Sequence, residues 1–297
     1  MPHRVQFDFE ITFSNGGGLS GRDFRLDIDG NDIADAALAA YLVEDLRLLM
    51  VGAVQIRNKR IIAEAHKREP AQASQPGEFV DLSHTIANGT LTHRGMPGPL
   101  ICDWLSREAS REKYAPGTEF QIARIDMIAN TGTYLDCPFH RFAEGSDLAD
   151  LALDACSDLD AVVVRADCRG GPAIDVGAFR GLDLKNRAVL VHTGWDAHWD
   201  TPAYFGVHPF LTEAAAQHLR EAGARLVGID SMNIDDTRPA TRPVHTTLLG
   251  AGILIVEHLC NLAAVPDRGF AFSAVPPKLR GVGTFPVRAM ARLHARR

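Results

Sequence analysis

The sequence has few cysteines, no excess of positive charge and no long apolar run. Its five cysteines, at positions 102, 137, 156, 168 and 260, are scattered and form no Cys-x-x-Cys pair, so no disulfide framework is expected. A reduced, cytoplasmic location follows. The net charge of −6 and the pI near 6.0 argue against nucleic acid and anionic membranes as partners. No apolar run approaches the roughly 20 residues that span a bilayer.

Residues 1–66 are predicted to form a small α+β module of ββαβ order. Apolar and polar residues alternate without error over residues 5–13, which is typical of a half-buried strand. A glycine-rich turn follows, and alternation resumes in a second strand near residues 24–28. Asp32 is predicted to cap a helix that begins near residue 35, and one or two short strands are predicted after it.

Residues 67–78 are polar and contain proline, so they are predicted to be a linker to a larger domain over residues 79–297. In that domain a capped helix is predicted near residues 212–221. Short strands there are continuously apolar, which indicates strands covered on both faces; they lie at residues 161–164, 188–191, 226–229 and 253–256. The pattern predicts an α/β domain that has a mixed sheet and flanking helices.

The segment from Asn130 to His140 reads Asn-Thr-Gly-Thr-Tyr-Leu-Asp-Cys-Pro-Phe-His. It resembles the His-x-Gly-Thr-His-x-Asp-x-Pro-x-His signature of the cyclase family, a group of metal-dependent hydrolases similar to kynurenine formamidase and isatin hydrolase. In that family the first two histidines and the aspartate bind metal, and the last histidine transfers a proton. Here Asp136 and His140 are retained, whereas Asn130 and Tyr134 occupy the positions of the two metal histidines.

Two later elements extend the resemblance, which covers about residues 79–290. His245, in Pro-Val-His-Thr-Thr-Leu-Leu, resembles a metal-binding histidine of the family, and Glu257 resembles its metal-bridging glutamate. Glu257 ends an apolar strand, where a buried carboxylate needs a cation, a hydrogen-bond network or a raised pKa. The resemblance therefore implies one divalent ion, Zn²⁺ or Mn²⁺, held by Asp136, His245 and Glu257.

Tyr134 has three alternative roles: it ligates the metal, donates a hydrogen bond to a substrate oxyanion, or fills the empty metal site. His192 is either a pocket residue or an ordinary core histidine. An apolar or aromatic small-molecule substrate is expected from the aromatic character of the candidate pocket residues. The residues predicted to bind substrate are Asn130, Phe139, His192, Trp195, Trp199 and Tyr204.

The favoured interpretation is a hydrolase that cleaves a C–N bond in an amide, formamide or cyclic imide-like compound, with metal assistance and His140 as acid and base. One alternative is a metal-independent lyase, dehydratase or cyclase of secondary metabolism that uses Tyr134, Asp136 and His140 directly. A second is a non-catalytic ligand-binding or scaffolding protein. The resemblance also implies a homodimer or homotetramer.

Overall fold

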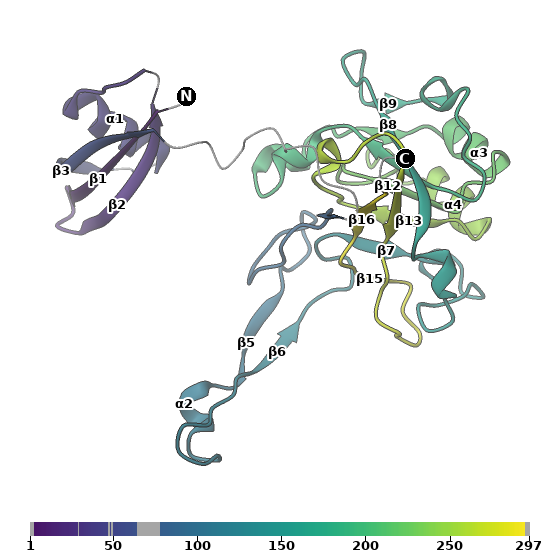
Figure 1. The fold of residues 1–297 in the computed structure, drawn as a ribbon, viewed down its shortest axis with the longest axis horizontal. Helices are drawn as coiled ribbons and strands as arrows, with labels where there is room; N and C mark the ends of the chain where they lie inside the picture. The colour runs from purple at the N-terminus through teal and green to yellow at the C-terminus, as the bar shows by residue number, and fades with distance from the viewer. Residues whose placement is uncertain (1–2, 29, 47, 49, 64–77, 295–297) are drawn as a thin grey trace. The chain divides into compact units, whose positions relative to one another are not determined.

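The chain divides into two compact units, residues 1–71 and residues 72–297. A computed structural model describes most of both units (Figure 1); the described ranges are 3–28, 30–46, 48, 50–63 and 78–294. The linker predicted at residues 67–78 lies outside the described residues, except for Glu78.

The first unit is a three-stranded antiparallel sheet, of order β2-β1-β3, with one helix. Its elements are β1 (His3–Phe13), β2 (Gly18–Ile28), α1 (Asp35–Asp45) and β3 (Val51–Ala63). Alternate residues of β1 are buried with apolar residues of α1, so the predicted ββαβ order and the alternating strand are confirmed. They include Val5, Phe7, Phe9 and Ile11 of β1 and Leu38 and Leu42 of α1.

The predicted helix cap in this unit was wrong. Ala34 is the N-cap residue of α1 and supplies no side-chain bond. The carboxylate of Asp32, three residues before the helix begins at Asp35, instead accepts a hydrogen bond from the backbone N–H of Ile33 at 2.8 Å.

The second unit is built on a nine-stranded mixed sheet of order β15-β7-β13-β12-β10-β8-β14-β16-β4. Strands β13, β12, β10 and β8 are parallel to one another, and the outer strands pair antiparallel. The strands are β4 (Phe79–Asp81), β7 (Tyr134–Asp136), β8 (Leu159–Arg165), β10 (Ala188–His192), β12 (Leu226–Ile229), β13 (Leu254–Glu257), β14 (Phe270–Ser273), β15 (Thr284–Pro286) and β16 (Met290–Leu293).

Apolar residues fill both faces of this sheet. Because side chains alternate along a strand, Ala161 and Val163 of β8 join one core while Val162 and Val164 join the other. The helices α3 (Glu213–Glu221) and α4 (Pro243–Gly250) pack on the second core through residues such as Leu219. The predicted fold class, an α/β domain with a mixed sheet and flanking helices, is confirmed. No helix among the described residues is long and apolar enough to cross a membrane.

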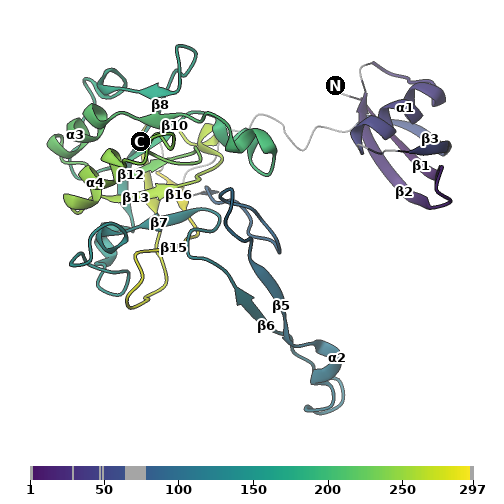
Figure 2. The same ribbon diagram turned by 180° about the vertical axis from the view of Figure 1, so that it is seen from behind.

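A two-stranded hairpin projects from the second unit (Figures 1 and 2). It comprises β5 (Leu100–Leu105), the short helix α2 (Arg107–Ser110) and β6 (Ile122–Asp126). A further small parallel pair joins β9 (Ala173–Ile174) to β11 (Phe210–Leu211). Short 3-10 turns connect these elements, at Pro138–His140, Leu153–Ala155, Val176–Phe179, Trp195–His198, Pro202–Phe205 and Leu262–Ala264.

Candidate active site

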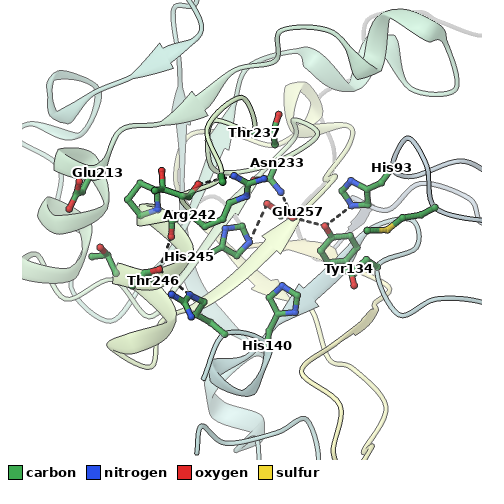
Figure 3. Close-up of a pocket in the computed structure, with 17 residues that line it drawn as sticks. His93, Tyr134, His140, Glu213, Asn233, Thr237, Arg242, His245, Thr246 and Glu257 are labelled. Atoms are coloured by element: carbon green, nitrogen blue, oxygen red, sulfur yellow. Dashed lines mark hydrogen bonds and ion pairs between the residues drawn. The ribbon is translucent and has the colours of Figure 1, made fainter. Parts of the chain in front are cut away.

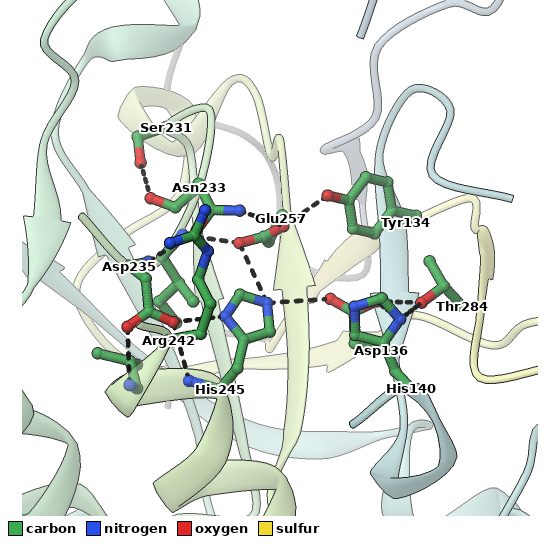
Figure 4. A network of polar contacts seen from close by, with 12 residues as sticks. Tyr134, Asp136, His140, Ser231, Asn233, Asp235, Arg242, His245, Glu257 and Thr284 are labelled. Atoms are coloured by element: carbon green, nitrogen blue, oxygen red, sulfur yellow. Dashed lines mark hydrogen bonds and ion pairs between the residues drawn. The ribbon is translucent and has the colours of Figure 1, made fainter. Parts of the chain in front are cut away.

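Strand register places the central polar residues side by side. In the antiparallel pair β7–β13, Tyr134 lies opposite Glu257, and in the pair β15–β7, Thr284 lies opposite Asp136. Tyr134 and Asp136 are two residues apart on one strand, so their side chains point to the same face. The helix α4 brings His245 to this face (Figure 4). Residues far apart in the sequence therefore meet at one end of the sheet.

His245 is held by Asp235, which lies in the loop before α4. The carboxylate of Asp235 lies 2.6 Å from His245 Nδ1 and accepts hydrogen bonds from the backbone N–H groups of Val244 and His245 at 2.8 and 3.0 Å. When the imidazole is neutral, this arrangement places its proton on Nδ1. The lone pair of Nε2 then faces Asp136 Oδ2 and Glu257 Oε1, each 3.7 Å away.

The negative charges of these buried carboxylates must be compensated by a positive charge. Burial opposes protonation of His245, but Asp136, Asp235 and Glu257 outweigh it and raise the pKa of His245 to about 10. Burial likewise raises the pKa of Glu257 to about 7, although the His245 charge acts in the opposite direction. Asp136 is fully buried, and its Oδ2 has no hydrogen-bond partner among the residues that the structure describes. A proton on His245 or a metal ion would supply the missing charge.

The donor atoms fit a divalent metal ion. Asp136, His140 and His245 each offer one ligand atom within 4.8 Å of the others, and Glu257 Oε1 is close to the same imidazole. Of the predicted set, Asp136 and His245 belong to this group, and Glu257 approaches it through His245. His140, predicted as the proton-transfer residue, is the third member of the group. A mixed carboxylate and imidazole set suits zinc or manganese. The unpaired Asp136 oxygen is the observation that supports this fit.

Thr284 links Asp136 to His140. Its hydroxyl donates to Asp136 Oδ1 and lies 2.6 Å from His140 Nδ1. A hydroxyl has one proton, so a Thr284 that donates to the carboxylate must accept from His140 Nδ1–H. The other ring nitrogen, Nε2, is then a free acceptor. Gly283 allows this contact, because a Cβ at that position would overlap the backbone of His140.

Tyr134 stands beside Glu257 where the family has a metal-binding histidine. Its hydroxyl donates to Glu257 Oε2 at 2.6 Å and lies 3.0 Å from His93 Nε2. Burial, followed by the charges of Glu257 and Asp136, raises the pKa of Tyr134 well above its ordinary value. Of its three predicted roles, this geometry favours the one in which a neutral phenol fills the empty metal site.

A cavity of about 760 Å³ opens over these residues (Figure 3). Its wall includes His93, Asn130, Tyr134, His140, His245 and Glu257. Of the six residues predicted to bind substrate, only Asn130 is part of this lining, among the residues that the structure describes.

The other five candidates contact different partners. Phe139 packs against the apolar core on one face of the sheet. Trp195 donates its Nε1–H to the carbonyl of Tyr204 at 3.0 Å, and the hydroxyl of Tyr204 lies 2.8 Å from His258 Nδ1. Trp199 stacks on the ring of His84, with centroids 3.9 Å apart. Trp195 and Trp199 therefore both pack against Tyr204.

His192 belongs to a second polar group, with Asp196 and Asp230, whose donor atoms also lie close together. Arg165 Nη1 lies 3.0 Å from His192 Nδ1, and a guanidinium can only donate. A neutral His192 therefore carries its proton on Nε2, the atom that lies 4.0 Å from Asp230. That proton and the Arg165 charge make this group unsuitable for a cation.

Several residues of the site gave little signal in the sequence. His93 lies in a loop 41 residues before its partner Tyr134, and Asp235 lies in a loop ten residues before His245. Asn233 comes from the same loop and approaches Glu257 at 3.5 Å. Thr284 sits in a Gly-Thr-Phe-Pro segment that resembles the family, but only the sheet register brings it to Asp136.

Comparisons with known proteins agree on one family. The family model Cyclase, described as "Putative cyclase", matches residues 80–236. Kynurenine formamidase from Bacillus cytotoxicus is 28% identical over 226 residues, which cover 72% of this chain and 97% of that protein. Kynurenine formamidase from Geobacillus thermodenitrificans is 29% identical over 185 residues, 62% of this chain and 85% of that protein.

Solved structures share the fold of the second unit. Isatin hydrolase A from Ralstonia solanacearum has a TM-score of 0.63 at 23% identity and covers 73% of this chain and 92% of its own. A structure named as a potential metal-dependent hydrolase with cyclase activity has a TM-score of 0.59 at 25% identity, with 72% and 96% coverage. The family model spans more than half of the sequence, and the prediction of an enzyme of this family is confirmed: the chain belongs to the cyclase family.

Proposed function

We propose that this protein is a metal-assisted hydrolase that cleaves a C–N bond in a small amide, formamide or cyclic imide-like compound. The observation that carries the proposal is the buried group of Asp136, His245 and Glu257, in which Asp136 Oδ2 has no hydrogen-bond partner within the described part of the chain. The kynurenine formamidases and isatin hydrolases similar to this chain support hydrolysis of this kind of bond.

A divalent ion bound by Asp136, His245 and Glu257 would polarise the substrate carbonyl and lower the pKa of a water molecule. His140 lines the cavity beside this group, with Nδ1 directed to Thr284. Its free Nε2 can take a proton from the attacking water and pass it to the departing nitrogen. Thr284 and the carboxylate behind it hold the ring in the orientation and tautomer that this role needs.

One ion per chain is proposed in place of two. The positions of two metal histidines of the family hold Asn130 and Tyr134, and a neutral phenol is a weak ligand. Tyr134 instead donates a hydrogen bond to Glu257, and the backbone N–H of Ile234 donates to the other oxygen at 2.6 Å. These bonds fix the orientation of the Glu257 carboxylate next to His245.

The metal-independent lyase, dehydratase or cyclase has less support. That alternative needs Tyr134 as an acid or base. Burial raises the pKa of this phenol, and its hydroxyl already donates a hydrogen bond to Glu257. A purely ligand-binding or scaffolding role is also less well supported. Burying several carboxylates around one imidazole lowers the stability of a fold. Such a cluster is typical of a site that binds a cation or catalyses a reaction.

The homodimer or homotetramer is also a proposal, and the β5–β6 hairpin supports it. A two-stranded hairpin has no core of its own, and this one exposes large apolar side chains. Trp104 is 72% exposed, Ile125 57% and Phe120 53%. A second copy of this chain is proposed to cover them. Trp104→Glu should lower the mass measured by light scattering, whereas an unchanged mass, or a monomeric wild type, would contradict this assignment.

Activity on a defined panel tests the proposed reaction. The full-length protein, supplied with Zn²⁺ or Mn²⁺, is incubated with an aryl formamide, an aryl acetamide, isatin and a cyclic imide, and products are separated by chromatography. Hydrolysis of at least one C–N bond is expected, with loss of activity in Glu257→Gln. Absence of any hydrolysis with either metal would refute the proposal. The cytoplasmic location stays a prediction.

A further inference from the structure

Two arginines line the cavity without a carboxylate partner. Arg141 follows His140 at the end of its 3-10 turn, and Arg242 is the N-cap residue of α4. Within the described ranges, neither guanidinium has a carboxylate oxygen within 4.0 Å. Arg238, in contrast, pairs with Asp236 at 2.7 Å only four residues from Arg242. Unpaired guanidinium groups on a cavity wall are suited to bind an anionic ligand.

Arg242 is fixed in place while part of its guanidinium stays available. Its Nη1 donates to the backbone carbonyls of Asp236, Pro239 and Thr241, at 3.4, 2.7 and 2.7 Å. Its Nε and Nη2 take part in no hydrogen bond with the described part of the chain. Figures 3 and 4 show Arg242 beside Asn233, on the side of the cavity where His245 lies.

Arg141 is anchored in a similar way. Its Nε donates to the hydroxyl of Thr246 at 3.2 Å, and its guanidinium carbon lies 5.3 Å from the centre of the Phe142 ring. Its two terminal nitrogens have no hydrogen-bond partner among the described residues. Thr246 lies on α4, the helix whose N-cap residue is Arg242, and both arginines line the cavity.

The charge of this part of the wall suits a monoanion. Glu213 also lines the cavity, and its carboxylate is 3.4 Å from Gln217 Nε2 on the same helix. Glu257, the other carboxylate of the described lining, already accepts hydrogen bonds from Tyr134 and Ile234. Two guanidinium groups against Glu213 leave one net positive charge. A carboxylate neutralises that charge and matches the geometry of a guanidinium, whereas a phosphate dianion would exceed it.

We infer that Arg141 and Arg242 form a subsite for a carboxylate group of the substrate. The inference rests on the proposed function, because it places that carboxylate in the cavity where the C–N bond is to be cleaved. The substrate class is thereby narrowed to anionic amides, formamides or imides, in which the carboxylate docks at the arginines. The reacting carbonyl would then be directed towards Asp136, His245 and Glu257.

Ligand binding tests the subsite without any turnover. Anthranilate and the neutral anthranilamide, which have nearly the same shape, are titrated by calorimetry into the full-length protein as purified. The wild type should bind anthranilate about 10- to 100-fold more tightly, and both Arg141→Gln and Arg242→Gln should lose most of this preference. Arg220→Gln removes an exposed charge elsewhere on α3 and should keep the preference.

Three binding results would overturn the subsite. Equal affinity of the wild type for the two ligands would do so. A preference that persists in both arginine variants would place the carboxylate elsewhere, for example on a bound metal. Tighter binding of inorganic phosphate than of anthranilate would assign the arginines to a different anion. Arg141 is exposed, so its variant keeps the test valid even if Arg242→Gln does not fold.

Kinetics separate this inference from the proposed function. With N-formylanthranilate and N-formylanthranilamide as substrates, either arginine variant should raise KM for the anionic substrate about tenfold more than KM for the neutral one. The change in kcat should be smaller, because the subsite binds a part of the substrate that does not react. If the wild type hydrolyses neither compound but still binds anthranilate more tightly than anthranilamide, the proposed reaction is refuted and the proposed subsite is supported. If the wild type hydrolyses both compounds with equal KM, the proposed subsite is refuted and the proposed reaction is supported.

Discussion

Replacing Asp235 by asparagine should weaken metal binding without removing any proposed metal ligand. The Asp235 carboxylate holds His245 through Nδ1 at 2.6 Å and accepts two backbone N–H groups at the start of α4. An asparagine side chain has one acceptor oxygen, so it cannot satisfy all three donors. The imidazole then loses the bond that fixes its tautomer and directs Nε2 towards Asp136 and Glu257.

Loss of such a partner typically lowers metal affinity about 10- to 100-fold. At about 1.4 kcal/mol for each factor of ten, this corresponds to roughly 1.4–2.8 kcal/mol of binding free energy. Calorimetric titration of Zn²⁺ and Mn²⁺ into wild type and Asp235→Asn measures it directly, with circular dichroism as the check that both proteins are folded. One unsatisfied buried donor should also cost about 1–3 kcal/mol of folding stability.

Asp236→Asn is the matched control. Asp236 is the next residue, but its carboxylate pairs with Arg238 at 2.7 Å and makes no contact with His245 in the described structure. The metal affinity of the Asp236→Asn variant should stay within about twofold of that of the wild type. Equal affinities for wild type, Asp235→Asn and Asp236→Asn would refute the idea that Asp235 orients a metal-binding histidine.

Three further predictions concern the same site. His140→Ala should lower turnover of an aryl formamide by about 10²- to 10⁴-fold, while elemental analysis finds nearly unchanged metal content; loss of the metal together with full activity on resupply would contradict its role as proton shuttle. The double variant Asn130→His with Tyr134→His should bind metal more tightly or bind a second ion, and unchanged calorimetric stoichiometry and affinity would favour the metal-independent alternative. Because the pKa of His245 is raised to about 10, its proton is bound in the metal-free protein at every pH below that value. Metal must displace this proton, so affinity should rise about tenfold per pH unit between about pH 7 and 9, and more steeply below pH 7, where Glu257, with its pKa of about 7, also releases a proton; a flat profile would contradict this expectation.

The sequence predicted the fold well where pattern and local signals agree. The alternating strand at residues 5–13 and the continuous apolar strand that ends at Glu257 were recognisable because periodicity reports directly on burial. The helix after Thr212 was recognisable from its cap, whose hydroxyl accepts from Ala215 N–H at 3.1 Å. The cap expected at Asp32 was wrong because its carboxylate bonds to the adjacent N–H.

The site could be predicted only where a motif marked it. Asp136, His140, His245 and Glu257 each lay in a segment that resembled the family, and the structure brings them together. Thr284 could not be paired with Asp136 from the sequence, because their contact joins strands 148 residues apart. A contact between residues so far apart in the sequence produces no periodic pattern from which it could be predicted.

For two aromatic residues the sequence predicted a place in the cavity lining that the structure does not give them. Trp195 and Tyr204 were expected to line the pocket because amphipathic rings often contact ligands. Their polar atoms instead find partners within the same loop and on His258, so the loop packs on itself. The residues that do line the cavity include Arg141 and Arg242, and single arginines in loops carry no pattern that distinguishes them from surface charges.

The central claim is that a single metal ion held by Asp136, His245 and Glu257 is required for C–N bond hydrolysis. The most direct test measures metal content by elemental analysis and turnover of N-formylanthranilate on the same samples, as a chelator removes the metal and Zn²⁺ or Mn²⁺ restores it. Activity should rise in proportion to bound metal and reach its maximum at one ion per chain. A fully active protein that contains no metal would contradict the account.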